Sequence, residues 1–247
     1  MLDSSHRTAT GEGTTPPDRS QAADPQNGDI ESFRRTYTYI AVEGAIGVGK
    51  TTLATFLSNR LQGRLILEEV EDNPFLPQFY RDRERAAFQT QLFFLLHRHQ
   101  QQLELAQMDL FQTVIVSDYI FEKDRIFASI NLNEHERTLY DHIMGLLDQH
   151  TVRPDLVVYL QASTDALMKR IHQRGRPYEK NIDVEYIRTL NESYNQFFFH
   201  YTGSHLLIVN ASELDLVNNE EHLEHILGQI VRPFKGTKWY VPMGERL

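Results

Sequence analysis

Short apolar runs alternate along this chain with longer segments of mixed polar and apolar residues, from residue 37 almost to the end. The short runs predict strands at residues 37–43, 64–68, 113–118, 155–160 and 206–210. The longer segments predict helices at 50–61, 84–107, 134–149, 164–173, 183–201 and 219–231. The runs at 114–116 and 156–160 suit strands buried on both faces. This alternation predicts an α/β protein, with a parallel sheet wrapped by helices.

The first 35 residues differ from the rest of the chain. Residues 8–29 contain hardly any large apolar side chain, so we expect residues 1–35 to form a disordered tail. This region lacks the apolar stretch of a secretory signal, and its acidic residues do not fit a mitochondrial transit peptide. We therefore expect one folded domain at residues 36–234, followed by a C-terminal tail at 235–247.

The overall composition excludes several kinds of chemistry. The 247 residues include no cysteine, which rules out disulfides, thiolate metal sites and a cysteine nucleophile, and suits a cytoplasmic protein. The formal net charge of −9 argues against a general binder of nucleic acid or of membrane surfaces. No apolar stretch is long enough to span a bilayer.

The stretch 44–51, G-A-I-G-V-G-K-T, fits the phosphate-loop motif G-x-x-x-x-G-K-[ST] and lies between a predicted strand and a predicted helix. Glycines let the main-chain N–H groups approach phosphate oxygens, and the following helix directs its positive end toward them. Lys50 is expected to reach the β- and γ-phosphates of ATP, and the Thr51 hydroxyl to hold Mg²⁺. The nucleotide-binding candidates are Gly44, Ala45, Ile46, Gly47, Val48, Gly49, Lys50, Thr51 and Thr52. The alternative is an ordinary glycine-rich turn.

Two predicted strands end in acidic residues, at the edge of the sheet where the phosphate loop lies. Glu68 is a candidate general base for a hydroxyl acceptor, and the acids that follow it favour a neutral acceptor over a phosphorylated one. Glu69, Glu71 and Asp72 fit a solvated acidic loop better. Asp118, after the third strand, is a candidate to order Mg²⁺.

Two other stretches suggest substrate contacts. Gln91 and Arg98 are seven residues apart and share a helical face, where an amide and a guanidinium suit the edge of a nucleobase. Ordinary polar surface residues are the alternative. Arg170, Arg174 and Arg176 end a helix and enter a Gly-Pro segment, which suits a mobile lid over a transferring phosphoryl group. Their alternative role is to complement the negative end of the helix dipole.

Taken together, these residues resemble the deoxynucleoside kinase family, and especially its bacterial members, over about residues 37–232. The resemblance depends on the phosphate loop, the run at 68–76, and single residues at matching spacing. The single residues are Tyr80, Gln91, Arg98, Ser117, Asp118, Asp124, Arg170, Arg174, Arg176 and Glu179. It implies a P-loop kinase fold with a five-stranded parallel sheet, flanking helices, a short arginine-rich lid and usually a homodimer.

The resemblance also implies a reaction: ATP- and Mg²⁺-dependent phosphorylation of the 5′-hydroxyl of a deoxynucleoside, in nucleotide salvage. It implies that Glu68 is the base, with Lys50 and the lid arginines catalytic. Tyr80 and Glu179 would hold the sugar 3′-hydroxyl, and Gln91, Arg98 and Asp124 would contact the nucleobase. If Arg98 and Asp124 pair, they suit purine deoxynucleosides or deoxycytidine better than thymidine, whose carbonyl oxygen would face the Asp124 carboxylate.

One departure from the family pattern concerns the acid-Arg-Ser triplet that usually follows the third strand. Here the triplet is Asp118, Tyr119 and Ile120, so its arginine is missing. Arg125 and the lid arginines are the candidates to replace it. Two alternative functions also remain: a nucleoside-monophosphate kinase of the thymidylate kinase type, and a kinase-like assembly subunit without catalysis.

Overall fold

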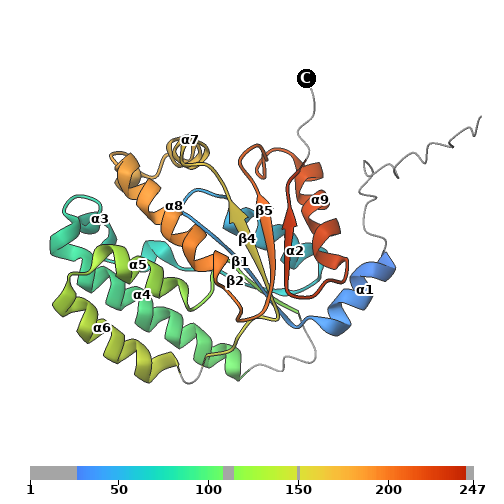
Figure 1. The fold of residues 1–247 in the computed structure, drawn as a ribbon, viewed down its shortest axis with the longest axis horizontal. Coiled ribbons are helices and arrows are strands. Elements are labelled where there is room, and N and C mark those ends of the chain that lie inside the picture. The colour runs from blue at the N-terminus through green and yellow to red at the C-terminus, as the bar shows by residue number, and fades with distance from the viewer. Residues whose placement is uncertain (1–26, 108–113, 149–150, 243–247) are drawn as a thin grey trace, which may run out of the picture.

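The computed structural model describes residues 27–107, 114–148 and 151–242, which form a parallel sheet with helices on both sides (Figure 1). The strands are β1 (Tyr39–Gly44), β2 (Arg64–Ile66), β3 (Ile115–Ser117), β4 (Leu156–Gln161), β5 (His205–Asn210) and β6 (Thr237–Tyr240). Their order across the sheet is β2-β3-β1-β4-β5-β6. The α/β class and the parallel sheet are confirmed, but the sheet has six strands where the family resemblance implied five.

The central strand, β1, lies between β3 and β4, and all six of its residues are buried. Ile40 pairs with Val116 of β3 and with Leu156 of β4, and these side chains are fully buried, as expected for strands covered on both faces. β2 and β3 lie on one side of β1, and the later strands β4, β5 and β6 lie on the other. The carboxyl ends of β1 and β3 therefore border the crevice in which sheets of this kind bind ligands.

Helices cover both faces of the sheet (Figure 1). They are α1 (Asn27–Thr36), α2 (Lys50–Arg60), α3 (Leu76–Phe79), α4 (Arg83–Ala106), α5 (Lys123–Asn131), α6 (Glu134–Leu147), α7 (Thr164–Arg174), α8 (Val184–Phe199) and α9 (Glu220–Val231), with the short 3-10 helices η1 (Val70–Asp72) and η3 (Pro177–Glu179). α1 and α2 both contact α9, while α6 packs outside α4 and α5. Stacked rings of Tyr159 and Phe198, with centroids 4.2 Å apart, join α8 to β4.

The predicted tails are partly wrong. Residues 27–36 form α1, whose Ile30 and Phe33 are buried three residues apart, and the Phe33 ring stacks on Tyr37 at 4.5 Å between centroids. Residues 237–240 form the edge strand β6, paired with β5. α1 buries two apolar side chains, Ile30 and Phe33, and no residue of β6 is buried, so the sequence signals of both elements are weak. The rest of the predicted N-terminal tail, residues 1–26, lies outside the described residues.

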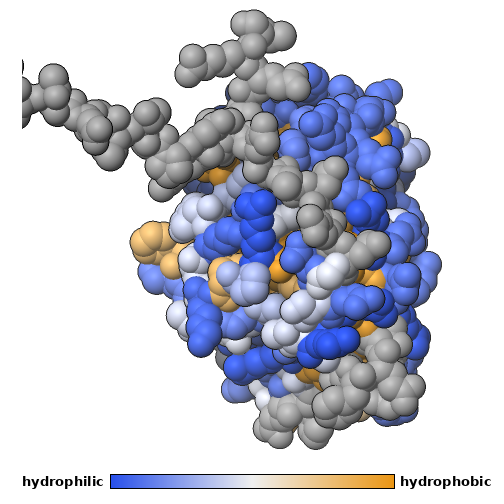
Figure 2. Space-filling model, turned by 90° about the vertical axis from the view of Figure 1, so that its right-hand side faces the viewer, coloured by the Kyte–Doolittle hydropathy of each residue, from blue (hydrophilic) through white to orange (hydrophobic). Residues whose placement is uncertain are grey.

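None of the helices in the described part of the chain is long and apolar enough to cross a bilayer. Figure 2 shows a face that is mainly hydrophilic, with separate apolar patches and no continuous one. Single exposed apolar side chains such as Trp239, which is 59% exposed, are ordinary features of protein surfaces.

Candidate active site

The phosphate-loop motif connects β1 to α2 at the crevice. Gly47 has a φ angle of 85°, and a Cβ atom there would lie 2.7 Å from Cγ1 of Ile171, so glycine is required. α2 begins at Lys50, and no side chain of the described residues caps its first N–H groups, which suits an anion. Lys50 Nζ donates a hydrogen bond to the Gly44 oxygen at 2.8 Å. Burial, followed by the nearby Lys123 ammonium, lowers the pKa of Lys50 to about 8.

The two residues predicted to hold Mg²⁺ lie side by side. The Thr51 hydroxyl donates to Oδ2 of Asp118 at 2.6 Å, and Asp118 is buried. The other carboxylate oxygen of Asp118 accepts the main-chain N–H of Glu68 at 2.8 Å. A hydroxyl and a carboxylate in contact beside a phosphate loop are hard oxygen ligands of the kind that Mg²⁺ prefers. The donor set therefore fits this ion, and the same carboxylate fixes the position of Glu68.

Glu68 lies at the centre of a group of buried charges. Its Oε1 accepts hydrogen bonds from Nε of Arg98 at 2.7 Å and also from Nη2. Its Oε2 accepts a hydrogen bond from Lys123 Nζ at 2.9 Å. Burial alone would raise the pKa of Glu68, but Arg98 and Lys123 outweigh it and hold the pKa well below its usual range. Glu68 is therefore ionised at neutral pH.

Gln91 and Arg98 share a buried face of α4, as the seven-residue spacing predicts, and both contact Asp124 of α5. Nη1 of Arg98 lies 2.5 Å from Oδ2 of Asp124. The Gln91 amide donates to the main-chain oxygen of Asp124 at 3.1 Å and also to its carboxylate. Asp124 is fully buried, so its charge depends on Arg98 for compensation.

Two buried polar atoms of this region have neither a hydrogen-bond nor an ion-pair partner among the described residues. They are Oγ1 of Thr90 and Oδ1 of Asn131, whereas Nη1 of Arg98 and Oδ2 of Asp124 pair with each other. Native proteins rarely leave buried polar atoms in this state, so a polar ligand is indicated. Thr90 and Asn131 both line the cavity described next. The sequence did not single them out, because an isolated polar residue in a helix forms no motif.

The site surrounds a cavity of about 270 Å³. Apolar side chains such as Phe79, Phe94 and Phe127 line it together with the charged groups, a mixture typical of small-molecule sites. Its lining also includes the predicted residues Ile46, Gly47, Lys50, Thr51, Glu68, Tyr80, Gln91, Arg98, Asp118, Arg174, Arg176 and Glu179. Candidates for phosphate, base and sugar contacts therefore meet at one cavity, whereas the base candidate Asp124 lies behind Arg98 and is not part of the lining.

The arginine-rich segment folds against this cavity. Arg174 Nη2 donates to both carboxylate oxygens of the buried Glu179, at 2.7 Å each. Nε of Arg176 lies 3.2 Å from Oε1 of Glu71, and the Tyr178 hydroxyl donates to the same oxygen at 2.8 Å. Glu71, which fits a solvated loop in the sequence, thus forms a contact between the lid segment and η1.

Arg170 lies apart from the other two arginines. It does not line the cavity, and its guanidinium donates to main-chain oxygens of Val48 at 3.3 Å, Ala211 at 2.6 Å and Leu214 at 2.8 Å. These bonds tie the phosphate loop to the segment that follows β5. In this conformation Arg170 is a structural tie, which differs from the lid role expected for it, because its donors are occupied by backbone carbonyls.

Arg98 supplies part of the charge that balances Glu68, and the rest comes from a residue that the sequence did not indicate. Arg125, one candidate for that role, is exposed and pairs with Asp148 at 3.0 Å. Lys123, two residues earlier, is buried against Glu68. The signal was missed because α5 was not predicted, and the two residues are 55 positions apart.

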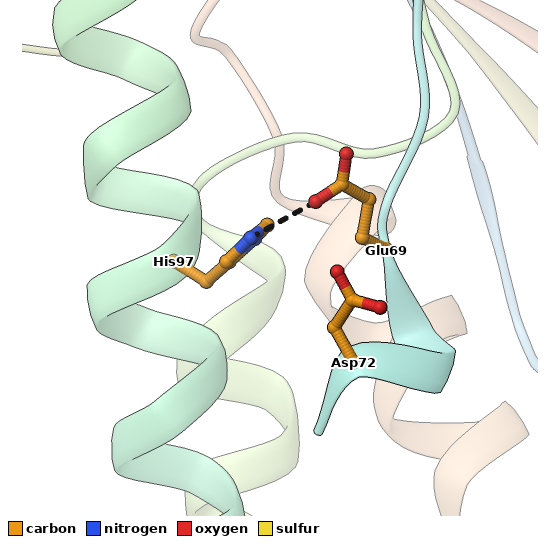
Figure 3. Close-up of side chains that lie close together, drawn as sticks. All are labelled: Glu69, Asp72 and His97. Carbon is orange, nitrogen blue, oxygen red and sulfur yellow. Dashed lines mark ion pairs between the residues drawn. The ribbon is translucent and has the colours of Figure 1, made fainter. Parts of the chain in front are cut away.

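A second group of ionisable residues lies outside the cavity. Ligand atoms of Glu69, Asp72 and His97 lie within 4.8 Å of one another (Figure 3). Nε2 of His97 is 3.1 Å from Oε2 of Glu69, and the His97 ring stacks on Phe93. Both carboxylates are exposed, and the ion pair occupies the histidine nitrogen, so we assign no metal to this group.

The phosphate loop after β1, the acids after β2 and β3, and an arginine-rich segment over the same cavity define a P-loop kinase. Residues 40–234 match the sequence model of the family described as deoxynucleoside kinase, and this chain belongs to that family. It is therefore an enzyme that phosphorylates deoxynucleosides to their monophosphates.

Individual relatives agree with this assignment. The chain is 36% identical over 200 residues to a deoxyguanosine kinase of Bacillus subtilis, covering 79% of this chain and 97% of the relative. It is 29% identical over 198 residues to the deoxyadenosine/deoxycytidine kinase of the same organism, covering 77% of this chain and 90% of that one. The structure of a deoxyadenosine kinase from M. mycoides with bound dATP is similar with a TM-score of 0.68 and 29% identity, covering 78% of this chain and 98% of that one.

Proposed function

We propose that this enzyme transfers the γ-phosphoryl group of ATP to the 5′-hydroxyl of a purine deoxynucleoside or deoxycytidine, in nucleotide salvage. The observation that carries the proposal is a single cavity lined by Lys50 of the phosphate loop, the ionised Glu68, and Arg98 with its partner Asp124 behind it. The negative charge of Glu68 suits a neutral hydroxyl acceptor better than a phosphorylated acceptor.

We assign Glu68 to the 5′-hydroxyl. As the hydroxyl oxygen attacks the γ-phosphorus, a bond forms between them, the bond from the phosphorus to the ADP oxygen breaks, and Glu68 takes the hydroxyl proton. Arg98 and Lys123 make Glu68 a weak base, but the transition state of phosphoryl transfer is loose and requires little prior deprotonation. Lys50 and the loop N–H groups stabilise the negative charge that develops on the phosphates.

We assign the metal role to Thr51 and Asp118, whose oxygens lie 2.6 Å apart beside the loop. Mg²⁺ held there neutralises charge on the β- and γ-phosphates when it is bound. Tyr80 and Glu179, which line the same cavity, are assigned to the sugar 3′-hydroxyl.

The preference among nucleobases follows from the hydrogen-bond donors and acceptors of the buried pair Arg98 and Asp124. Asp124 Oδ2 and Arg98 Nη1 pair with each other at 2.5 Å, and a second N–H of Nη1 and a second lone pair of Oδ2 leave capacity for a ligand. An exocyclic amino group of adenine or cytosine can donate to the carboxylate, and guanine can offer a ring N–H. Thymine would place a carbonyl oxygen against the carboxylate, which leaves buried polar groups unpaired.

An acceptor panel tests the proposal. We expect ATP and Mg²⁺ to support phosphorylation of deoxyadenosine, deoxyguanosine or deoxycytidine with kcat/KM about 5- to 200-fold above thymidine, the range for one unpaired buried group. The measurement is the steady-state rate with the four deoxynucleosides and their monophosphates. Thymidine as the best acceptor would contradict the base assignment, faster turnover of a monophosphate would indicate a monophosphate kinase, and no turnover of any acceptor would indicate a non-catalytic subunit.

Asp124→Ala tests the recognition pair directly. We expect it to narrow the gap between thymidine and the best acceptor, and to lower the thermal midpoint because Arg98 loses one of its two carboxylate partners. Asp141→Ala on α6 is the matched control, since that carboxylate is exposed. An unchanged acceptor ranking in a folded Asp124→Ala enzyme would remove Asp124 from base recognition.

The lid assignment predicts a separate effect. We expect Arg176→Ala to lower kcat more than it raises the KM for the acceptor, because a closing residue contributes mainly after the substrates bind. Arg188→Ala on α8, which removes an exposed arginine, serves as the control. Hydrogen exchange of residues 172–182 is expected to slow when a bisubstrate ligand binds. Equal exchange with and without the ligand would argue against a moving lid.

Association with a second copy is the remaining part of the proposal. Leu139 and Leu146 of α6 are 51% and 72% exposed and lie seven residues apart, on one helical face. Leu96 of the neighbouring α4 is 50% exposed. These side chains support a homodimer through α4 and α6, which a measurement of the molecular mass in solution tests.

The lack of cysteine supports the cytoplasm as the location of the enzyme.

A further inference from the structure

Tyr119 stands where the family pattern has an arginine, and it contributes no charge to the site. Its side chain is fully buried, and its hydroxyl donates to Oε1 of Gln101 at 2.7 Å. The Gln101 amide donates in turn to the Leu67 oxygen at 3.1 Å. Tyr119 therefore braces the segment that carries Glu68, and another residue must supply the positive charge.

The position of Lys123 makes it the residue that supplies this positive charge. It is the first residue of α5, is only 2% exposed, and places Nζ 2.9 Å from Oε2 of Glu68. It also lines the cavity together with Lys50 and Thr51. The start of α5 thus brings a second ammonium to the phosphate side of the site, from a part of the chain far from the phosphate loop in sequence.

The Lys123 ammonium has more donors than its contacts use. A lysine has three N–H donors, and the hydrogen bond to Glu68 uses one of them. The nearby Phe127 ring, with its centroid 5.7 Å away, offers only a weak cation–π contact. Glu68 is already neutralised at its other oxygen by Arg98. A buried cation with spare donors and a shared anion suits a further anionic partner.

We propose that Lys123 is a catalytic residue that contacts the transferring phosphoryl group while it holds Glu68, and so performs the role of the missing arginine. This inference rests on the proposed function. Lys123 keeps its proton throughout. The bond from the 5′-oxygen to phosphorus forms, the bond to ADP breaks, and the hydroxyl proton goes to Glu68. The charge of Lys123 stabilises the phosphoryl oxygens during the step.

The test compares Lys123→Met, Lys123→Gln and Lys123→Arg with wild type and with Lys235→Met, which removes an exposed lysine. We expect Lys123→Met and Lys123→Gln to lower kcat by about 10²- to 10³-fold, with acceptor KM changed by less than about threefold. Lys123→Arg should recover a large part of the lost rate. The glutamine variant keeps a donor for Glu68, so it separates lost charge from lost folding, which thermal unfolding checks.

A binding measurement isolates the phosphoryl contact without turnover. Calorimetry gives the affinities of deoxyadenosine and dAMP, and of deoxyguanosine and dGMP, for wild type and Lys123→Gln. We expect the monophosphates to bind about tenfold or more weakly to the variant, the range for a hydrogen bond to a charged group, with little change for the nucleosides. Equal losses for nucleoside and monophosphate, or a kcat within threefold of wild type, would overturn the proposal. If wild type phosphorylates no deoxynucleoside, the proposed function fails, while the binding comparison still decides the role of Lys123.

Discussion

Replacement of Lys50 by alanine is expected to lower kcat by about 10³-fold, the largest single loss in this enzyme. Phosphoryl transfer leaves little covalent chemistry to the protein, so catalysis consists mainly of positioning and stabilising charge. Lys50 is partly buried at the start of α2 and donates hydrogen bonds to the carbonyl oxygens of Gly44 and Ala45. Its removal takes away both the ammonium assigned to the phosphates and the hydrogen bonds that hold the phosphate loop together.

Two controls show whether a loss of turnover in Lys50→Ala comes from the missing ammonium. Lys235→Ala removes an exposed lysine and should leave turnover unchanged. Thermal unfolding shows whether the Lys50→Ala protein is folded, since loss of the loop contacts can lower stability. A folded Lys50→Ala enzyme with turnover near wild type would remove the phosphate loop from the proposed mechanism.

Glu68→Gln is expected to lower kcat by about 10²-fold or more, because the amide keeps the shape of the side chain but cannot take the hydroxyl proton. The same change leaves Arg98 and Lys123 buried without this carboxylate, so a lower thermal midpoint is also expected. The rate is therefore measured at a temperature where the variant is fully folded.

Glu69→Gln is the matched control for the carboxylate. Glu69 is the adjacent residue, but its side chain is exposed and pairs with His97 outside the cavity. We expect a mild effect on kcat. If Glu69→Gln were the more damaging change, the general base would be misassigned by one residue.

Local patterns explain why much of the site was predictable from the sequence. The phosphate loop is a contiguous motif, and Glu68 and Asp118 follow strands whose carboxyl ends meet at one edge of a parallel sheet. Gln91 and Arg98 are linked by helical periodicity alone. Each of these inferences needs only the spacing within one element, together with the general geometry of such sheets.

The parts that were missed depend on contacts between distant elements. Lys123 meets Glu68 because α5 packs beside α4, and α5 was not among the predicted helices. Glu71 and Tyr178, 107 residues apart, meet where the lid segment reaches η1. Arg170 matches the lid pattern in sequence, but nearby carbonyls occupy its donors. Side-chain partners of this kind follow from packing, which spacing does not encode.

The guanidinium of Arg98 contacts two carboxylates with different assignments, Glu68 on one side and Asp124 on the other. Under the proposed base contact, a nucleobase that fits poorly against Asp124 would displace the same guanidinium that orients Glu68. A wrong base would then slow the chemical step as well as weaken binding, both through one side chain. Acceptor fidelity would in that case depend on turnover more than on affinity.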